Sequence, residues 1–306
     1  MGDCEGETMP PTVGWIGCGV MGSSMVKNLL AEKYEVGLYT RTESKAQALL
    51  DSGARWFESP AQLAVHHDIV ISMVGYPEDV ESVYLGETGI LSKPSGDRRC
   101  TCVIDMTTSQ PTLACKIAEV ASRQGIASLD APVSGGDVGA RDATLSIMVG
   151  GDTDAFARAQ PIFGVLGKQA ILQGGPGAGQ HAKMVNQIII ASTMIGMCEG
   201  LLYARRSGLD AQKVLGSVSE GAAGSWSLSN LAPRILQGDF QPGFFVEHFV
   251  KDIGIALAEC EQMGIDLEGL KLARRLYDEV LQAGGGRLGT QALYRAIDNE
   301  RERDGS

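Results

Sequence analysis

The stretch Val13-Gly-Trp-Ile-Gly-Cys-Gly-Val-Met-Gly22 decides the fold, because it joins an apolar run to glycines in the spacing G-x-G-x-x-G. The apolar run over 13–16 predicts a buried strand, and apolar residues at helical spacing over 21–32 predict a helix. A second strand is predicted over 36–39. A glycine-rich turn that follows a strand, opens a helix and precedes another strand is typical of a dinucleotide-binding unit.

Each glycine of this turn has its own predicted task. Gly17 allows the tight turn, Gly19 lets backbone N–H groups approach a pyrophosphate, and Gly22 permits close packing of the helix on the strand. We predict that the turn binds a dinucleotide through five residues: Gly17, Gly19, Val20, Met21 and Gly22. The alternative is a glycine-rich turn that holds no ligand.

Outward from this stretch, strand-like and helix-like runs alternate along the first half of the chain. Helices are predicted over 44–52 and 111–124, and strands over 68–74, 102–106, 127–130, 145–149 and 170–173. Strands separated by helices predict a mostly parallel sheet that is covered on both faces. The fold class is therefore α/β, with a Rossmann-type doubly wound sheet.

The pattern changes after Gly179. Residues 181–207 contain no proline and carry apolar residues at helical spacing, which predicts one long helix between the sheet domain and an all-α C-terminal domain. The remaining sequence, to about Asn299, predicts helices only. We predict four parts: a disordered N-terminus over 1–11, a nucleotide-binding domain over 12–175, a helical substrate and oligomerisation domain over 176–299, and a frayed tail over 300–306.

The end of the second strand bears on the choice of cofactor. A site for NAD(H) places an acidic residue there to bind the ribose 2′-hydroxyl. This chain instead has Arg41, with Thr42 and Lys45 close by. A guanidinium beside hydroxyl donors suits a 2′-phosphate, so we predict NADP(H) in preference to NAD(H). The alternative is that Arg41 and Lys45 are ordinary solvated surface charges.

A second glycine turn follows the predicted strand over 127–130. Ser134 precedes Gly135 and Gly136, and a serine hydroxyl beside two glycine N–H groups can hold a carboxylate. A tight turn without a ligand is the alternative.

The long helix carries a lysine in unusual surroundings. Lys183, Asn186 and Gln187 lie at i, i+3 and i+4 and share one helical face, which continues as apolar Ile190 and Met194. Desolvation on such a face would lower the pKa of the lysine and make it a proton donor near neutrality. The alternative is that Lys183 extends its ammonium group to the surface.

Composition narrows the possible partners. The net charge is −11, and the chain has no block of Lys and Arg, so a nucleic-acid partner is not expected. The apolar part of the long helix contains polar residues, which favours a buried core helix over a membrane span. Seven cysteines without a C-x-x-C pair, beside only four histidines, favour reduced cytoplasmic thiols and no metal site.

Five motifs in order resemble those of the β-hydroxyacid dehydrogenases, a family that includes 3-hydroxyisobutyrate dehydrogenase, tartronate semialdehyde reductase and the glyoxylate and succinic semialdehyde reductases. The resemblance extends from Val13 to about Asp298. The glycine-rich opening over 14–22 and the D-x-[ST]-T-x-x-P segment over 105–111 match. So do D-A-P-V-S-G-G-x-x-G-A over 130–140, G-x-G-x-x-x-K-x-x-N over 177–186, and the segment from Phe244 to Lys251-Asp252.

The resemblance implies a reaction and the residues that carry it out. A hydride passes between the nicotinamide and a small carboxylated semialdehyde or its 3-hydroxy acid. Lys183 would be the general acid/base, and Asn186 would orient it or the substrate. The turn over 134–136 would hold the substrate carboxylate, with Phe244 and Asp252 near the closed site.

The resemblance also implies further cofactor contacts and an assembly. Val74, Gly75 and Thr108 would line the nicotinamide, and Lys251 would reach the cofactor from the helical domain. Members of the family commonly form dimers or tetramers, so a homodimer or homotetramer is expected.

The sequence departs from the family pattern at several positions. Ala143 replaces a glycine, Gln187 replaces a second asparagine, and Met73-Val74-Gly75 replaces M-L-P, which leaves the substrate open. Four alternatives stay open: a sulfonated-aldehyde reductase, an imine reductase, 6-phosphogluconate dehydrogenase and a non-catalytic NADP(H)-binding protein. The presence of Lys183 argues against imine reduction, and the short helical region argues against 6-phosphogluconate dehydrogenase.

Overall fold

The computed structural model describes residues 10–92 and 98–303, with side chains up to residue 298. By its contacts the chain divides into a first unit, Met1–Lys183, and a second unit, Met184–Ser306. Helix α8 (Ala178–Arg206) contributes residues to both units. Most of the predicted disordered N-terminus lies outside the described residues. Helix α13 (Leu293–Arg303) enters the predicted frayed tail, whose last three residues also lie outside them.

The first unit is built on one sheet. Within the described residues its nine strands have the order β3-β2-β1-β4-β5-β6-β8-β7, with β9 beside β8. Six strands pair in parallel: β1 (Val13–Ile16), β2 (Val36–Tyr39), β3 (Arg55–Trp56), β4 (Ile69–Ser72), β5 (Cys102–Asp105) and β6 (Ala127–Asp130). Their order is that of a doubly wound sheet, which confirms the predicted fold class.

The remaining strands close one side of this sheet. Strand β8 (Leu145–Gly151) runs antiparallel to β6 and to β7 (Val133–Ser134), and β9 (Gly167–Gly174) runs parallel to β8. The prediction of a mostly parallel sheet is therefore confirmed. Strands β8 and β9 run opposite to the six parallel strands, and β8 pairs with β7, which ends at Ser134.

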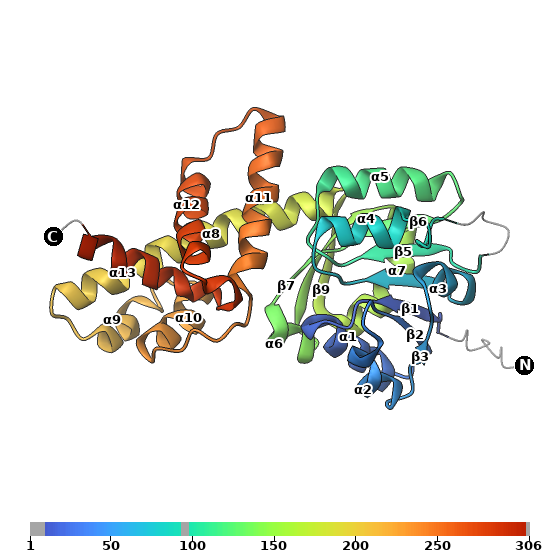
Figure 1. The fold of residues 1–306 in the computed structure, drawn as a ribbon, viewed down its shortest axis with the longest axis horizontal. Helices are drawn as coiled ribbons and strands as arrows, with labels where there is room; N and C mark the ends of the chain where they lie inside the picture. Colours follow the sequence, from blue (N-terminus) through green and yellow to red (C-terminus); the bar gives the residue numbers. More distant parts are fainter. Residues whose placement is uncertain (1–9, 93–97, 304–306) are drawn as a thin grey trace, which may run out of the picture. The chain divides into compact units, whose positions relative to one another are not determined.

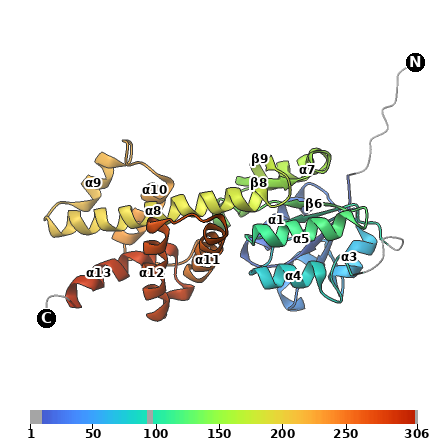
Figure 2. The same cartoon turned by 90° about the horizontal axis from the view of Figure 1, so that it is seen from above.

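Helices cover both faces of the sheet (Figure 1 and Figure 2). Helices α1 (Val20–Ala31), α2 (Gln47–Leu50) and α7 (Thr153–Leu166) pack on one face. Helices α3 (Pro60–His66), α4 (Pro77–Leu85) and α5 (Pro111–Ser122) pack on the other. Alternate residues of one strand supply the two cores: Ile69 and Ile71 join the core with α1, and Val70 joins the core with α4. This explains why successive residues of β4 are apolar, with no alternation between apolar and polar side chains over 69–71.

Some local elements differ from the predictions. The predicted helix over 44–52 is wrong in extent, because the chain forms a 3₁₀ turn, η1 (Glu43–Lys45), and then the short α2. Of this segment only Ala46 and Leu49 are buried, so there is too little apolar surface for a longer helix. Helices α3, α4, α6 (Gly136–Arg141) and α7 lie outside the predicted elements. Three of them start at strong local signals: Pro60 after the capping Ser59, Pro77, and the capping Asp152.

The second unit has helices only in its named elements. They are α8, α9 (Ala211–Val218), α10 (Trp226–Leu236), α11 (Val246–Met263), α12 (Glu268–Gln282) and α13, with the 3₁₀ turns η3 (Gly285–Arg287) and η4 (Thr290–Ala292). The fully buried rings of Phe249 and Tyr277 meet edge to face at 5.0 Å in its core. The Tyr277 hydroxyl donates to Thr290 O at 3.0 Å, so the buried ring leaves no polar atom unpaired.

Helix α8 is long and apolar enough to cross a membrane, and it is the one such helix within the described residues. Its buried side contributes Ala191, Met194, Cys198 and Leu201 to the core of the second unit. One side of α8 is therefore a core face, as the prediction of a core helix requires.

Candidate active site

The predicted glycine turn lies between β1 and α1, at the carboxyl edge of the sheet. Gly17 has φ +101°, and a Cβ there would lie 2.2 Å from Met73 O, just beyond the neighbouring strand β4. A Cβ on Gly22 would lie 2.2 Å from Gly17 O. By contrast, nothing among the described residues lies within 4 Å of a Cβ on Gly19. Two glycines therefore make close packing possible, and the third faces open space.

This turn has the features that a dinucleotide needs. Helix α1 has 12 residues, begins after Gly19, and has no acidic residue in its first turn and no side-chain cap among the described residues. Its first N–H groups are therefore not taken by a side chain and suit a pyrophosphate. Val20 is 65% exposed in the same turn, whereas Met21 is half-buried. The residues present fit a nicotinamide dinucleotide.

The residues predicted to bind a 2′-phosphate are exposed beyond the end of β2. Thr42 precedes the η1 turn and Lys45 ends it. The Arg41 side chain is 81% exposed, and its Nη1 lies 2.8 Å from Oδ1 of Asp79, in the first turn of α4. Asp79 holds one nitrogen of the guanidinium group, and a planar guanidinium has further donors for a phosphate.

The segments after β4 and β5 are tied to each other by hydrogen bonds. Thr107 Oγ1 accepts from Val74 N at 3.0 Å, and Thr107 N donates to Asp105 Oδ1 at 3.1 Å. Ser72 Oγ donates to the same carboxylate oxygen at 2.8 Å. Burial raises the pKa of Asp105 to about 6, although the Ser72 and Thr107 hydrogen bonds oppose this rise. Three residues predicted to line the nicotinamide lie half-buried in these two segments: Val74, Gly75 and Thr108.

The second predicted glycine turn leads from β7 into α6. Ser134 ends β7 and is half-buried, and Gly135 and Gly136 both have positive φ, at +135° and +64°. Side chains other than glycine rarely adopt this conformation, so the two glycines are required by the turn itself. Their presence therefore has a structural reason in addition to the predicted carboxylate site.

Lys183 is buried, with 7% of its surface exposed. Its Nζ donates to Val133 O at 2.9 Å. The alternative that this lysine extends its ammonium group to the surface is therefore wrong. Because Val133 directly precedes Ser134, the lysine ammonium and the second glycine turn meet at the same short strand, β7.

The start of α8 is fixed by Asp130, at the end of β6. Asp130 accepts from Gly177 N through Oδ1 and from Gln180 N through Oδ2, each at 2.8 Å. Burial raises the pKa of Asp130, and these N–H groups oppose the rise. A Cβ on Gly179 would lie 2.5 Å from Asp130 O and from Met148 O, so the helix backbone rests directly on the sheet backbone. This contact gives a physical reason for the G-x-G spacing before Lys183.

Three predicted site residues of the second unit form one polar row. Asn186 Nδ2 donates to Gln187 Oε1 at 2.7 Å, and Gln187 Nε2 donates to Asp252 Oδ2 at 2.6 Å. Lys251 Nζ lies 3.1 Å from the other oxygen, Asp252 Oδ1. Phe244 is not part of this row, because its ring packs against Phe249 at 6.1 Å.

Four residues outside the predicted site hold the predicted residues in place: Asp79, Asp130, Gln180 and Gln187. Two of them carry a sequence signal, because Gln180 lies one helical turn before Lys183 and Gln187 one turn after it. Asp130 begins the D-A-P-V-S-G-G motif, although its partners on α8 could not be read from that motif, and Asp79 carries no sequence signal.

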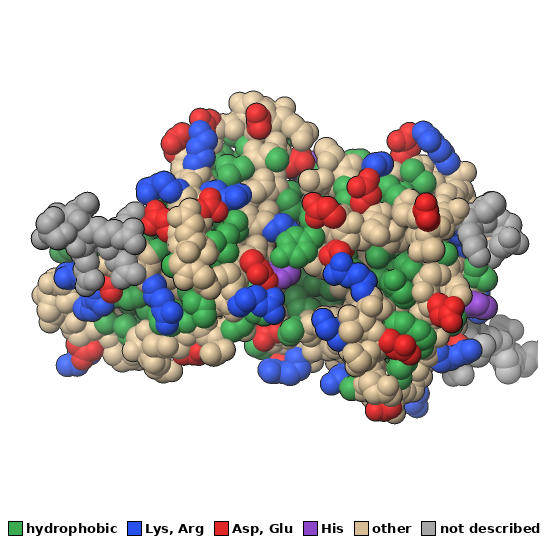
Figure 3. Space-filling model, viewed as in Figure 1, with side chains coloured by type: hydrophobic (Ala, Val, Ile, Leu, Met, Phe, Trp, Pro, Cys, Tyr) green, Lys and Arg blue, Asp and Glu red, His purple; other side chains and the backbone are tan. Residues whose placement is uncertain are grey.

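The surface shows no block of one charge on the face drawn in Figure 3, where Lys and Arg side chains are interspersed with Asp and Glu. Within the described part of the chain, no group of three or more His, Cys, Asp or Glu residues is placed to hold a metal ion.

Comparison with known proteins agrees with the geometry. The family model for the NAD binding domain of 6-phosphogluconate dehydrogenase matches residues 12–175. The model described as NAD-binding of NADP-dependent 3-hydroxyisobutyrate dehydrogenase matches residues 177–297. A 2-hydroxy-3-oxopropionate reductase from Escherichia coli is 35% identical over 94% of this chain and 97% of its own length. The chain belongs to the β-hydroxyacid dehydrogenase family.

Other relatives of this β-hydroxyacid dehydrogenase are similar over nearly the whole chain. A probable 3-hydroxyisobutyrate dehydrogenase-like protein from Arabidopsis thaliana is 50% identical over 94% of this chain and 85% of its own length. The solved structure of 3-hydroxyisobutyrate dehydrogenase from Mycobacterium tuberculosis is 29% identical, has a TM-score of 0.85, and covers 94% of this chain and 99% of that chain. The protein is thus an NAD(P)-dependent hydroxyacid dehydrogenase.

Proposed function

We propose that this dehydrogenase uses NADP(H) to interconvert a small carboxylated semialdehyde and its 3-hydroxy acid, with Lys183 as the general acid/base. The observation that carries the proposal is the 2.9 Å hydrogen bond from Lys183 Nζ to Val133 O. It brings a buried ammonium group to the residue that precedes Ser134, the serine of the carboxylate-binding turn. A small substrate that carries both a carbonyl group and a carboxylate requires a proton donor, here Lys183, next to a carboxylate-binding turn, here the one that begins at Ser134.

Lys183 moves the proton in this reaction. When bound, the nicotinamide would supply a hydride to the carbonyl carbon of the semialdehyde, or would accept one from the hydroxyl-bearing carbon of the 3-hydroxy acid. In reduction, the Lys183 ammonium donates a proton to the carbonyl oxygen, and in oxidation the amine takes a proton from the hydroxyl group. Val133 O orients Nζ by accepting a hydrogen bond from it at 2.9 Å.

The turn over 134–136 holds the other end of the substrate. The Ser134 hydroxyl and the N–H groups of Gly135 and Gly136 are donors that suit a carboxylate. Fixing the carboxylate fixes the distance between the carbonyl group and Lys183, and such positioning lowers the barrier by several kcal/mol.

The preference for NADP(H) rests on the residues beyond β2. Arg41, Thr42 and Lys45 supply donors there, and the segment from Tyr39 to Thr42 has no acidic residue to bind a ribose 2′-hydroxyl. The Asp79 carboxylate holds Arg41 Nη1 at 2.8 Å and limits where the guanidinium group can go. The description of the second matching family model, which names an NADP-dependent enzyme, also supports this preference.

The proposal includes residues of the second unit. Asn186, Asp252 and Phe244 contribute to substrate binding, and Lys251 contributes to cofactor binding. The support for the three polar residues is that Gln187 joins them into one row, in which Asp252 is 1% exposed and pairs with Lys251.

A direct absorbance assay at 340 nm tests the proposal. The oxidation of NADPH and of NADH is followed with glyoxylate, succinic semialdehyde, tartronate semialdehyde, methylmalonate semialdehyde and a sulfonated aldehyde. We expect rapid turnover of one carboxylated aldehyde, with a lower KM for NADPH than for NADH. Equal KM values contradict the cofactor preference. Binding of NADPH without turnover of any aldehyde contradicts the catalytic role and supports a non-catalytic cofactor-binding protein.

A further inference from the structure

The side chain of Gln180 is completely buried and forms hydrogen bonds with the backbone of the segment after β5. Its Oε1 accepts from Ser109 N at 2.9 Å, and its Nε2 donates to Thr107 O at 2.7 Å. One amide group thus pairs with the backbone on both sides of Thr108, as a neighbouring strand would. Residues 106–110 belong to no helix or strand, so this amide supplies backbone partners that regular structure does not.

The backbone of Gln180 is fixed as firmly as its side chain. Its N–H donates to Asp130 Oδ2 at 2.8 Å. The preceding residue, Gly179, packs with its backbone against Asp130 and Met148, with no space for a side chain. Gln180 therefore cannot shift to follow the segment at Thr108, and each fixes the position of the other.

Lys183 follows Gln180 by three residues on the same helix. The rise of a helix per residue is constant, so the place of Gln180 determines where the Lys183 backbone lies. Lys183 Nζ is then held by Val133 O at 2.9 Å. A short and rigid connection thus runs from the backbone around Thr108, through Gln180, to the lysine ammonium.

We propose that Gln180 is a positioning residue, which sets the separation between the nicotinamide-lining segment at Thr108 and the proton donor Lys183. This inference rests on the proposed function, because it takes Lys183 as the acid and Thr108 as a neighbour of the nicotinamide. Hydride and proton transfer to one carbonyl group require both reacting partners to be in place at once. A side chain that fixes both segments supplies this condition.

The role requires an amide of this length. Thr107 offers a carbonyl acceptor and Ser109 an N–H donor, so the side chain must present a donor and an acceptor together. Ionised glutamate keeps the acceptor but places an oxygen against Thr107 O in place of the donor, and methionine keeps the shape but loses both hydrogen bonds. The two variants therefore disrupt the contact in two different ways without a large change in volume.

The test compares Gln180→Met and Gln180→Glu with a matched control, Gln291→Met. Gln291 is 1% exposed and donates to Asp239 O at 3.2 Å and Gln241 O at 3.1 Å, so its replacement also removes two buried hydrogen bonds, but in the second unit. The measurements are kcat, KM for NADPH, the primary isotope effect with NADPH deuterated at the transferred position, and amide hydrogen exchange.

For Gln180→Met we expect kcat to fall by about 10- to 100-fold, because a small misplacement of reacting groups costs rates of this order. The KM for NADPH should change little, and the isotope effect should rise because hydride transfer becomes slower than the other steps. Amide exchange should increase in residues 107–109 and 177–184 together. Gln180→Glu should show the same changes, because the carboxylate offers no donor to Thr107 O. Gln291→Met should lower the melting temperature and leave kcat and the isotope effect unchanged.

The outcomes separate this inference from the proposed function. If the wild type turns over an aldehyde but Gln180→Met and Gln180→Glu keep its kcat and isotope effect, the positioning role is wrong and the proposed function stands. If Gln180→Met does not fold, Gln180→Glu decides by the same criteria. If the wild type turns over no aldehyde, the proposed function fails, and unchanged exchange in residues 107–109 on replacement of Gln180 overturns the structural coupling as well.

Discussion

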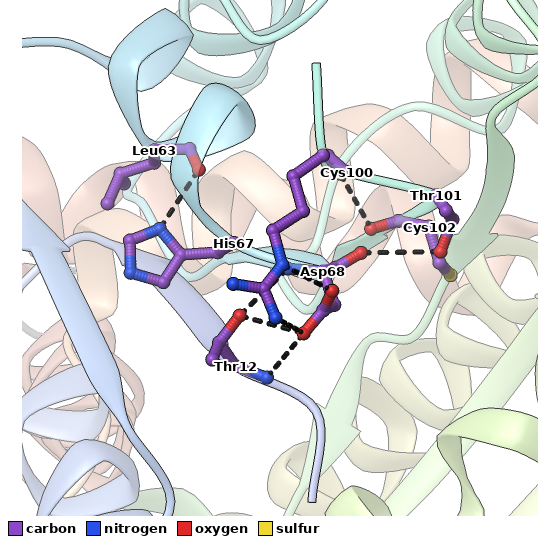
Figure 4. Close-up of polar contacts among 8 residues, drawn as sticks. Thr12, Leu63, His67, Asp68, Cys100, Thr101 and Cys102 are labelled. Carbon is purple, nitrogen blue, oxygen red and sulfur yellow. Dashed lines mark hydrogen bonds and ion pairs between the residues drawn. The ribbon is translucent and has the colours of Figure 1, made fainter. Parts of the chain in front are cut away.

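The two edges of the sheet in the first unit both use carboxylates, but for different purposes. At the amino-terminal edge, Asp68 precedes β4 and lies 2.7 and 2.9 Å from two nitrogens of Arg99 (Figure 4). Thr12, before β1, donates to Asp68 through its N–H and its hydroxyl, each at 2.8 Å. Burial raises the pKa of Asp68, but the hydrogen bonds from Arg99 and Thr12 outweigh this effect and lower the pKa.

Two further side chains at this amino-terminal edge contact backbone oxygens. His67 contacts Leu63 O through Nδ1 at 2.9 Å, and Thr101 Oγ1 donates to Asp68 O at 3.4 Å (Figure 4). Burial is also the main reason why the pKa of His67 is lowered. The contacts of Asp68 with Thr12 and Thr101 join the beginnings of β1, β4 and β5, and Arg99 compensates the charge of its carboxylate.

At the carboxyl edge the carboxylates hold backbone and hydroxyl groups instead. Asp105 binds Ser72 Oγ and Thr107 N, and Asp130 binds the N–H groups of Gly177 and Gln180. Burial raises the pKa of both. These carboxylates fix two segments and one helix start around the candidate site. The comparison predicts that changes at the amino-terminal edge affect stability, and that changes among the site residues at the carboxyl edge affect rates.

The largest expected effect is that of Lys183→Ala. We expect kcat to fall by about two to four decades, because a general acid/base contributes this much, while NADPH binding is retained. Steady-state kinetics and fluorescence titration with NADPH measure the two quantities. Lys116→Ala is the matched control, since Lys116 is an exposed lysine of the same unit that pairs with Glu81. Wild-type turnover in Lys183→Ala would show that another group moves the proton.

The next effect tests the cofactor preference at the same edge. Arg41→Ala should raise the KM for NADPH by about 10- to 100-fold, since a hydrogen bond to a charged group contributes about 1.5–3 kcal/mol. The KM for NADH should change little. Asp79→Asn, which keeps an oxygen for Arg41 but removes the charge, should have a smaller effect. An equal rise in KM for both cofactors in Arg41→Ala would count against 2′-phosphate binding.

A third prediction concerns stability at the carboxyl edge. The folded pKa of Asp105, about 6, lies above the ordinary value of 3.8. The folded protein therefore keeps this proton to higher pH than the unfolded chain does. The stability contributed by the group is complete below about pH 4 and falls by up to about 3 kcal/mol as the pH rises to about 6.

Asp105→Asn should remove this loss, because its Oδ1 can accept from both Ser72 and Thr107 without a charge. Urea unfolding at several pH values measures the difference between variant and wild type, which should grow from pH 4 to pH 7. Asp142→Asn, at an exposed ion pair with Arg141, is the control. A constant difference across this range would mean that Asp105 does not titrate as the structure indicates.

The smallest effect is expected at the amino-terminal edge. Arg99→Met should lower the free energy of unfolding by about 0.5–1 kcal/mol at pH 7, because both side chains are partly exposed. The sign is opposite to that of Asp105. The pKa of Asp68 is lowered, so this stability is present above about pH 4 and disappears as the pH falls through the folded pKa. A reduced kcat in Arg99→Met at full cofactor saturation would break the distinction between the two edges.

The sequence predicted the elements that have strong local patterns. The strands over 13–16, 36–39 and 127–130 are confirmed residue for residue, and the first two are mainly apolar runs bounded by turn residues. Helices α4 and α7 were missed, although Pro77 and the capping Asp152 mark their starts. The length of the helix predicted over 44–52 was overestimated, because the segment has little apolar surface to pack against the rest of the unit.

The sequence predicted which residues belong to the candidate site, but it did not predict which contacts they make. Lys183 was identified by its place on an apolar helical face, and the structure adds that Val133 O holds its ammonium group. The link that Gln187 makes between Asn186 and Asp252 was not predicted, because Gln187 is separated from Asp252 by 65 residues.

By itself the sequence determined the doubly wound fold, the glycine turns and the family. These depend on local conformation: a positive φ, a free helix N-terminus or an apolar run is written in a few adjacent residues. Only the tertiary structure decided which groups hold the site together. Gln180 meets Thr107 across 73 residues, Asp130 meets Gln180 across 50, and Arg41 meets Asp79 across 38. No local pattern specifies such pairs, because they exist only where the carboxyl ends of several strands meet at one edge of the sheet.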